Sequence, residues 1–347
     1  MNLPFVSIIM PVRNEGSFIA RSLSAALAQD YPADKMEVII ADGMSTDGTR
    51  ETVSDVARTH ANLRLIDNPR QIVSTGLNAA IREAKGEILI RVDGHCEISP
   101  DYVRLCVAQL LKDHAECVGG PLETIGETYV AQVIAAAMSS RFGVGDSSFR
   151  IGASEPKLVD TVPFPAYKRE TLRRVGNFDE ELVRNQDDEY NYRLRKLGGR
   201  ILLSPEIRSR YYSRAAFGSL WKQYFQYGFW KVRVLQKHAR QMRLRQFGPA
   251  LFVASLLVTL LLWPWIHGAR FLPLVIAGTY TVVSLAASVF TARRHGWKLL
   301  PLLPLAFAIL HVGYGCGFIA GLMRFWNRWG SVNPKLQPPR LIENSRL

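Results

Sequence analysis

Residues 87–97 read Glu-Ile-Leu-Ile-Arg-Val-Asp-Gly-His-Cys-Glu, and this stretch indicates the fold of the first half of the chain. The run from Ile88 to Val92 is typical of a buried strand, and it stops at Asp93 and Gly94, where the chain must turn. In an open α/β sheet, ligands bind at the carboxyl ends of the strands. Asp93 and His95 are therefore candidate ligands for one divalent cation. The alternative is a turn-capping Asp beside a loop His.

The residues before this stretch alternate between strand and helix patterns. Strands are expected at Val6–Met10, Met36–Ala41 and Leu63–Ile66. Helical patterns separate them, which predicts an α/β fold with a parallel sheet covered by helices. Polar loops follow the first two strands, so both loops leave the sheet on the side of Asp93.

These loops carry three candidate ligand-binding side chains. Asp42 can accept a hydrogen bond from a base ring, and Asn14 and Glu15 reach the same edge of the sheet. Helix capping explains the loops equally well. Neither a Walker loop nor Gly-x-Gly-x-x-Gly follows the first strand, so the usual nucleoside-triphosphate and dinucleotide fingerprints are missing.

A second acidic cluster, Asn185-Gln-Asp-Asp-Glu189, opens a predicted helix. Acidic side chains at a helix N-terminus complement its dipole, so a solvated cap is one interpretation. The other makes Asp187 a general base that takes the proton of a sugar hydroxyl.

Charge is distributed very unevenly along the chain. Residues 1–204 hold 28 acidic and 24 basic side chains, whereas residues 205–347 hold 2 acidic and 19 basic ones. Three runs without formal charge, of 24, 22 and 25 residues, lie in the second part, and the apolar segments expected there are 247–267, 271–292 and 299–323. About 20 apolar residues cross a bilayer as a helix, so a membrane is favoured over nucleic acid as the partner.

Aromatic and basic residues are mixed just before these runs, with nine aromatic side chains between Tyr211 and Trp230. This composition is typical of an amphipathic helix in the headgroup layer. A full crossing by the third run would put the basic tail outside, but Pro301 and Pro304 also allow a re-entrant segment. Gly313, Gly317 and Gly321 predict close helix packing.

The order and spacing of the motifs resemble family 2 glycosyltransferases with the GT-A fold over residues 4–235. The matching stretches are Val6-Ser-Ile-Ile-Met-Pro-Val-Arg-Asn-Glu15, Ile40-Ala-Asp-Gly-Met-Ser-Thr-Asp-Gly-Thr49, Ile90-Arg-Val-Asp-Gly-His95, Val175-Gly-Asn-Phe-Asp179 and Gln186-Asp-Asp-Glu-Tyr-Asn-Tyr-Arg193. With its apolar C-terminal part, the chain is most similar to membrane glucosyltransferases of succinoglycan-type exopolysaccharide assembly. The expected regions are a catalytic domain (1–205), an interface region (206–245), a transmembrane region (246–325) and a basic tail (326–347).

The resemblance implies a role for each donor-side residue. Pro11, Asn14 and Glu15 match the family's nucleotide-sugar loop, and Asp42 matches the acid that reads the uracil ring. Asp93 matches the first acid of the family's metal motif. His95 stands where the family usually has a second Asp, which tilts the expected Mn²⁺ or Mg²⁺ toward Mn²⁺.

On the acceptor side, Asp187 matches the family's catalytic acid, and Asp188 is the neighbouring alternative. Arg193, Gln226 and Trp230 are candidate acceptor or interface residues. Gln226 and Trp230 resemble the ends of the Gln-x-x-Arg-Trp motif of processive members. Phe229 replaces the Arg of that motif, so transfer of a single sugar is expected.

The expected activity is an inverting transfer of one hexose, glucose from UDP-glucose, to a polyprenyl-diphosphate-linked saccharide. The expected place is the inner membrane, with several crossings and a cytoplasmic catalytic domain, and other polysaccharide-assembly proteins are further implied partners. Two alternatives stay open: a transferase acting on polyprenyl phosphate itself, and a non-catalytic membrane component that binds nucleotide sugar or lipid.

Overall fold

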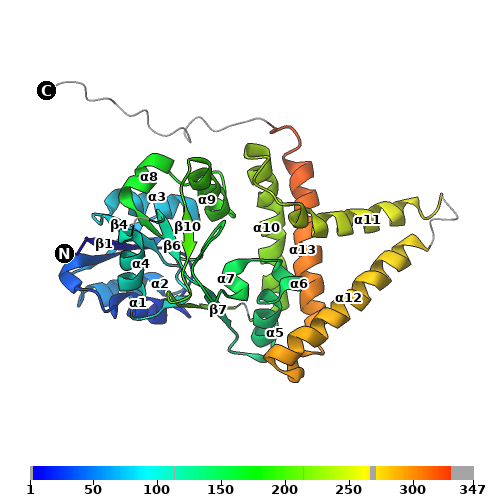
Figure 1. Cartoon of the computed structure of the whole chain (residues 1–347), viewed down its shortest axis with the longest axis horizontal. Helices are drawn as coiled ribbons and strands as arrows, with labels where there is room; N and C mark the ends of the chain where they lie inside the picture. The colour runs from blue at the N-terminus through cyan, green and yellow to red at the C-terminus, as the bar shows by residue number, and fades with distance from the viewer. Residues whose placement is uncertain (1–2, 113, 214, 266–270, 330–347) are drawn as a thin grey trace. The chain divides into compact units, whose positions relative to one another are not determined.

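A computed structural model describes residues 3–112, 114–213, 215–265 and 271–329 of the chain (Figure 1). The described residues form two compact units. The first comes from Met1–Glu123 and Gly152–Tyr211, and the second from Thr124–Ile151 and Tyr212–Ser331. This grouping departs from the expected continuous domain 1–205, because the segment from Thr124 to Ile151 belongs with the C-terminal helices. Most of the predicted basic tail lies outside the described residues.

The first unit is built on a sheet of order β3-β2-β1-β4-β9-β6-β10-β8. The strands are β1 (Val6–Val12), β2 (Met36–Asp42), β3 (Leu63–Asp67), β4 (Ile88–Arg91), β6 (Cys117–Gly119), β8 (Lys157–Leu158), β9 (Ala166–Lys168) and β10 (Ile201–Leu203). The strands β3, β2, β1 and β4 are parallel, whereas β9 runs antiparallel to both β4 and β6. The expected α/β fold is confirmed, and the antiparallel strand β9 makes the sheet mixed instead of wholly parallel.

Helices alternate with these strands, and every residue of β1 and β2 is buried as a result. The helices of this unit are α1 (Ile19–Leu27), α2 (Thr49–Ala57), α3 (Val73–Glu83), α4 (Tyr102–Leu111), α8 (Arg169–Val175) and α9 (Gln186–Lys196), with the short η1 (Ala33–Lys35). A smaller sheet has the order β5-β11-β7, formed by β5 (Cys96–Ile98), β11 (Ser209–Tyr212) and β7 (Leu122–Ile125).

The first strand does not end at Pro11, as its proline suggests, but continues to Val12. Ile9 faces β4, because its carbonyl accepts the N–H of Val92 at 3.0 Å. Pro11 comes two residues later in the strand, so its backbone nitrogen points to the same side as that of Ile9. The paired part of β4 ends opposite Ile9, so Pro11 lies beyond it. The missing N–H of proline therefore costs no ladder hydrogen bond, and Val12 ends the strand opposite Asp42.

The second unit is helical. Its helices are α5 (Tyr129–Met138), α6 (Arg141–Val144), α7 (Ser148–Ile151), α10 (Phe217–Lys237), α11 (Gly248–Leu262), α12 (Leu272–His295) and α13 (Leu303–Arg324), with the short η2 (Leu244–Phe247) and η4 (Trp297–Leu299). The aromatic and basic stretch forms α10, so the helix expected there is present. Ala131, Val133 and Ile134 of α5 are buried, which holds this helix within the unit.

Two of the three expected spans are helices long and apolar enough to cross a membrane, namely α12 and α13. The first expected span, 247–267, contains only the 15-residue helix α11, and its last two residues lie outside the described part of the chain. At 1.5 Å per residue, α11 is about 22 Å long, less than the roughly 30 Å of a hydrocarbon core. The helix α11 by itself is therefore too short to cross the hydrocarbon core.

Candidate active site

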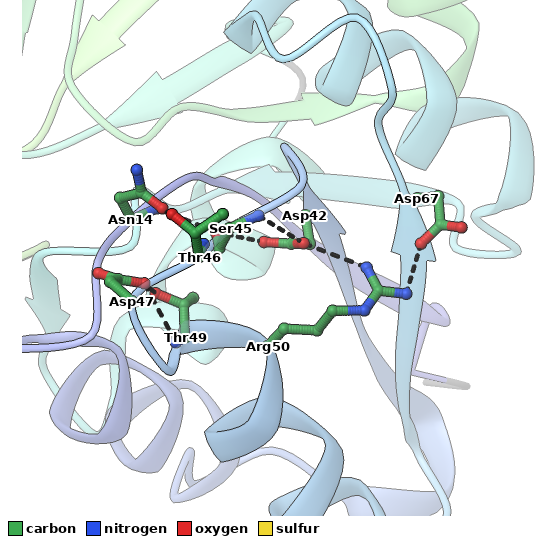
Figure 2. A network of polar contacts seen from close by, with 8 residues as sticks. All are labelled: Asn14, Asp42, Ser45, Thr46, Asp47, Thr49, Arg50 and Asp67. Carbon is green, nitrogen blue, oxygen red and sulfur yellow. Dashed lines mark hydrogen bonds and ion pairs between the residues drawn. The ribbon is translucent and has the colours of Figure 1, made fainter.

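The loops that follow β1 and β2 are joined by hydrogen bonds (Figure 2). The backbone N–H of Asn14 donates to Ser45 Oγ at 2.9 Å. The side-chain oxygen of Asn14 accepts the backbone N–H of Thr46, also at 2.9 Å. The Glu15 N–H donates to Thr49 Oγ1 at 2.8 Å. The sequence places Asn14 and Glu15 on this edge of the sheet, and the structure holds their backbone in one defined conformation there.

Asp42 lies at the centre of this network and is completely buried. Ser45 Oγ donates to its Oδ1 at 2.5 Å, and Arg50 Nη1 contacts its Oδ2 at 3.1 Å. Arg50 also donates to Asp67 at 2.6 Å, and its hydrogen bonds to Asp67 and Asp42 raise the pKa of its guanidinium (Figure 2). Both carboxylate oxygens of Asp42 are thus engaged inside the protein. Asp42 therefore anchors the loop, and its contact with a base ring stays a prediction.

Asp47 closes the same loop. Its carboxylate accepts the Gly16 N–H at 2.8 Å and the Thr49 hydroxyl at 2.5 Å. Loss of water around Asp47 acts to raise its pKa, but these hydrogen bonds outweigh that effect and lower the pKa overall. Asn14 and Met44 adopt positive φ values of 53° and 57°, a conformation that costs energy for residues other than glycine. The network explains how this backbone shape is held.

The residue that organises the metal motif is Arg91, at the end of β4. Its Nε donates to Asp93 Oδ1 at 3.0 Å and its Nη2 to Asp93 Oδ2 at 3.2 Å, so the pair is bidentate. Arg91 is 8% exposed. Burial acts to lower its pKa, but the charges of Asp93 and Asp187 raise it above its usual value, so the guanidinium stays charged.

Asp187 lies in the first turn of α9, on the other side of Arg91. Its Oδ2 is 4.0 Å from Arg91 Nη1, and its Oδ1 accepts the Asp188 N–H at 2.9 Å. Loss of water raises the pKa of Asp187, with the charges of Asp188 and Asp93 acting in the same direction and Arg91 opposing them. The side chain is 47% exposed, so water still screens it and a ligand can reach it. Asp187 thus combines access with a raised pKa, as a general base requires.

His95 is partly buried and is held by a carboxylate. Its Nδ1 lies 2.9 Å from Glu15 Oε1, and its ring packs edge-on against Tyr211, with 5.0 Å between centroids. A carboxylate on one imidazole nitrogen orients the other nitrogen, Nε2, for ligand binding. Gly94 permits this approach, because a Cβ there would lie 2.9 Å from Glu15 Cγ and 3.0 Å from Val12 Cγ1.

Asp93 and His95 can hold a divalent ion only if oxygen atoms of a substrate supply further ligands. Among the residues that the structure describes, no group of three or more His, Cys, Asp or Glu side chains is arranged to hold a metal. Asp93 and His95 would supply at most two ligands, and Asp93 already binds Arg91. A diphosphate would have to complete the coordination shell, as oxygen-rich substrates do for Mg²⁺ and Mn²⁺.

Several predicted site residues lie elsewhere. Pro11 is buried inside β1 and reaches no open surface. Arg193 is 7% exposed, and its guanidinium binds Glu189 at 2.7 Å and the carbonyl of Val175 at 2.7 Å. These buried contacts make Arg193 a support of α9, so we withdraw the acceptor contact expected for it. Gln226 and Trp230 lie on α10, in the second unit.

Two arginines that the sequence patterns do not single out, Arg50 and Arg91, complete the site. Arg91 interrupts an apolar strand two residues before Asp93. A cation in a buried strand needs an acidic partner, so that interruption is a usable signal. Arg50 lies in the first turn of α2, an ordinary amphipathic helix, and gives no such signal. Gln186, directly before Asp187, is buried, and its Oε1 has no hydrogen-bond partner among the described residues.

Comparison with solved structures defines the class of the fold. The chain is similar to the mannosyltransferase PcManGT of Pyrobaculum calidifontis, solved with GDP-mannose and Mn²⁺, with a TM-score of 0.59 and 20% identity over 93% of this chain and 88% of that one. It is also similar to GalNAc-T7, solved with UDP, GalNAc and Mn²⁺, with a TM-score of 0.52 and 18% identity over 68% of this chain and 48% of that one. The fold is therefore that of the GT-A transferases.

Sequence comparison then identifies the family. The model of glycosyl transferase family 2 matches residues 7–173. The chain is 32% identical to the succinoglycan biosynthesis protein ExoA of Rhizobium meliloti (strain 1021) over 323 residues, 92% of this chain and 96% of the relative. It is 28% identical, over 74% of this chain and 83% of the relative, to a dolichyl N-acetyl-alpha-D-glucosaminyl phosphate 3-beta-D-2,3-diacetamido-2,3-dideoxy-beta-D-glucuronosyltransferase of Methanococcus voltae. The chain belongs to glycosyltransferase family 2 and is a glycosyltransferase, so the expected family is confirmed and the non-catalytic alternative is set aside.

Proposed function

We propose that this protein is an inverting glycosyltransferase that moves one glucose from UDP-glucose to a polyprenyl-diphosphate-linked saccharide in exopolysaccharide synthesis. The observation that carries the proposal is the half-exposed Asp187, whose pKa is raised and which lies 4.0 Å from the buried Arg91 that also binds Asp93. One guanidinium thus connects the proposed base to the proposed donor side of the site.

The proposed reaction is a single displacement. An acceptor hydroxyl attacks the anomeric carbon of the donor, and Asp187 takes its proton as the new glycosidic bond forms. The bond from the anomeric carbon to the diphosphate breaks on the opposite face, which inverts the configuration. Arg91 favours the ionised form of Asp187 by opposing the rise in its pKa. Asp188 is the alternative base one residue further along the chain.

Donor binding is proposed for the edge where β1, β2 and β4 end. Asp93 and His95 would hold Mn²⁺ or Mg²⁺ together with the donor diphosphate, and the ion would offset the charge of the leaving group. Glu15 would orient His95 for this contact, given their separation of 2.9 Å. Asn14 would contact the donor directly, while Asp42 would act indirectly by holding the shape of the loop.

The acceptor proposal draws on two relatives. ExoA is named for succinoglycan biosynthesis, and the Methanococcus voltae enzyme is named for a lipid-phosphate-linked sugar acceptor. The first name supports a role in exopolysaccharide synthesis, and the second supports an acceptor that already carries a sugar over bare polyprenyl phosphate. The apolar helices of the second unit support work at a membrane. We propose the inner membrane, with the catalytic unit on its cytoplasmic side and other polysaccharide-assembly proteins as partners. Gln226 and Trp230 on the aromatic helix α10 are proposed acceptor or interface residues.

The test is transfer of labelled glucose by membranes that contain the full chain. The reactions contain UDP-glucose, extracted lipid-linked saccharide or polyprenyl phosphate, and Mn²⁺, Mg²⁺ or a chelator. We expect metal-dependent label in the organic-solvent phase with the saccharide acceptor, and its loss in Asp187→Asn. If polyprenyl phosphate is labelled and the lipid-linked saccharide is not, the proposed acceptor is wrong. If label is transferred from another UDP-sugar and not from UDP-glucose, the proposed donor is wrong. Undiminished transfer by Asp187→Asn would overturn the proposed base.

A further inference from the structure

Helices α10 and α13 of the second unit run side by side with their backbones in contact (Figure 1). A Cβ at Gly317 would lie 2.0 Å from the carbonyl oxygen of Phe225, and one at Gly321 would lie 2.6 Å from that of Phe229. Moving four residues along one helix moves four along the other in the same direction, so the helices are parallel. The close packing predicted from the glycine spacing is confirmed, and its partner is the aromatic and basic helix.

The other sides of α13 are also covered by protein. A Cβ at Gly315 would lie 2.5 Å from the carbonyl oxygen of Pro249, at the start of α11. His311 Nε2 contacts the carbonyl of Phe142 in α6 at 2.9 Å, and its Nδ1 contacts the Tyr280 hydroxyl of α12 at the same distance. Both ring nitrogens of His311 are therefore engaged. Enclosure by α10, α11, α6 and α12 makes α13 the central helix of this unit.

Helices α11 and α12 differ sharply from α13 in exposure. Large apolar side chains project from them, including Leu261 (73% exposed), Val282 (67%) and Phe290 (65%). Only 17% of the most apolar window of α12 is buried in the protein, against 44% for α13. No formal charge occurs between Phe271 and Ala292. This surface has the composition of one that faces lipid.

The position of Lys222 decides how α13 can lie in a bilayer. Gly313, at the middle of α13, lies against Trp221 of α10, because a Cβ at Gly313 would lie 3.5 Å from the carbonyl oxygen of Trp221. Lys222 follows directly and is exposed. Because the two helices are parallel, a crossing by α13 would carry α10 across as well. Lys222 would then face lipid near mid-depth, where a charged side chain is costly and rarely found.

We propose that α13 does not cross the bilayer. Helices α11 and α12 alone enter the hydrocarbon, as a hairpin, and the α10 and α13 pair lies along the headgroup layer. Arg293 and Arg294, at the end of α12, then mark the return to the cytoplasmic side. The chain thus ends on the side of the membrane on which it began. This inference rests on the membrane location within the proposed function, but it does not depend on the donor or the acceptor.

The test is labelling of single added cysteines with a membrane-impermeant maleimide, in spheroplasts and in inverted vesicles. The positions are Lys222→Cys, a cysteine appended after Leu347, and Arg58→Cys, whose native side chain is 79% exposed in the first unit. The native chain, in which Cys96, Cys106 and Cys117 are buried and Cys316 is partly exposed, provides the background that is subtracted. We expect all three added cysteines to label in inverted vesicles and none in spheroplasts.

Two labelling results would overturn the inference. One is an appended cysteine that labels only in spheroplasts while Arg58→Cys labels only in inverted vesicles. The other is a Lys222→Cys variant that labels in neither preparation. Release of the native chain from the membranes by salt or carbonate would instead show that no part of it is embedded in the bilayer. Glucose transfer is measured on the same vesicles, so a failed catalytic proposal is recognised separately from a failed topology.

Discussion

Replacing Arg91 by Gln tests the link between the proposed base and the donor side of the site. The substitution removes the bidentate partner of Asp93 and the cation 4.0 Å from Asp187. Removing one member of a buried ion pair costs about 3–5 kcal/mol of unfolding free energy. Asp93 remains 25% exposed, so we expect the lower end, about 3 kcal/mol.

The effect on catalysis has a definite sign. The charge of Arg91 opposes the rise in the pKa of Asp187, so its loss raises that pKa further. At 4.0 Å, two unit charges interact by about 1 kcal/mol in water and about 4 kcal/mol at an effective dielectric constant of 20. Asp187 is 47% exposed, so the value lies toward the lower figure. A base must be deprotonated, and the acid limb of the pH–rate profile therefore moves to higher pH.

The assay is the transfer rate at saturating donor across pH 5 to 9, together with denaturant unfolding of the same preparations. Arg91→Lys is the matched control, because it keeps the charge but loses the planar fork. We expect the lysine variant to lose stability while its acid limb stays near that of the native enzyme. If the glutamine variant loses stability but its acid limb does not move, Arg91 has a structural role only and our electrostatic argument is wrong.

Three further predictions concern the same site. Asp187→Asn should retain UDP binding, measured by calorimetry, and its transfer rate should fall about 10²–10⁴-fold, whereas Asp188→Asn should keep most of the rate. The reverse pattern would make Asp188 the base. Glu15→Gln should weaken Mn²⁺ binding about 10–100-fold in electron paramagnetic resonance titrations with UDP present, and His95→Ala should weaken it at least as much; unchanged binding in both would exclude His95 as a ligand. Gly94→Ala should lose about 1–3 kcal/mol in denaturant unfolding, because its Cβ would lie 2.9 Å from Glu15 Cγ, and native-like stability would contradict the close packing.

Much of the catalytic unit follows from local patterns in the sequence. Apolar runs that end at polar residues locate β1, β2, β3 and β4, since a strand buried on both faces must be apolar along its length. Parallel strands bring their carboxyl ends to one edge, so the sequence alone assigns Asn14, Glu15, Asp42, Asp93 and His95 to that edge. Here the sequence is sufficient, because the pattern repeats within short segments.

The contacts that each side chain makes required the tertiary structure, whether the partner is near or far along the chain. The burial of Asp42 depends on Arg50 and Ser45, and the role of Arg193 depends on its contact with Val175, 18 residues away. Residue type alone does not distinguish an acid that faces a ligand from one that holds a loop. The same limit applies to Arg91, whose two acidic partners come from different elements.

The sequence by itself determined that the chain has an α/β unit with acidic residues at one sheet edge, followed by apolar segments long enough to reach a bilayer. Both properties follow from the local composition and periodicity of the sequence. Only the tertiary structure decided which apolar helix is enclosed by protein and which is exposed. Hydropathy is equal for α12 and α13, at 1.8, because it counts side chains without regard to what packs against them. The glycine contacts of α13 with Phe225 and Phe229 supply that missing information.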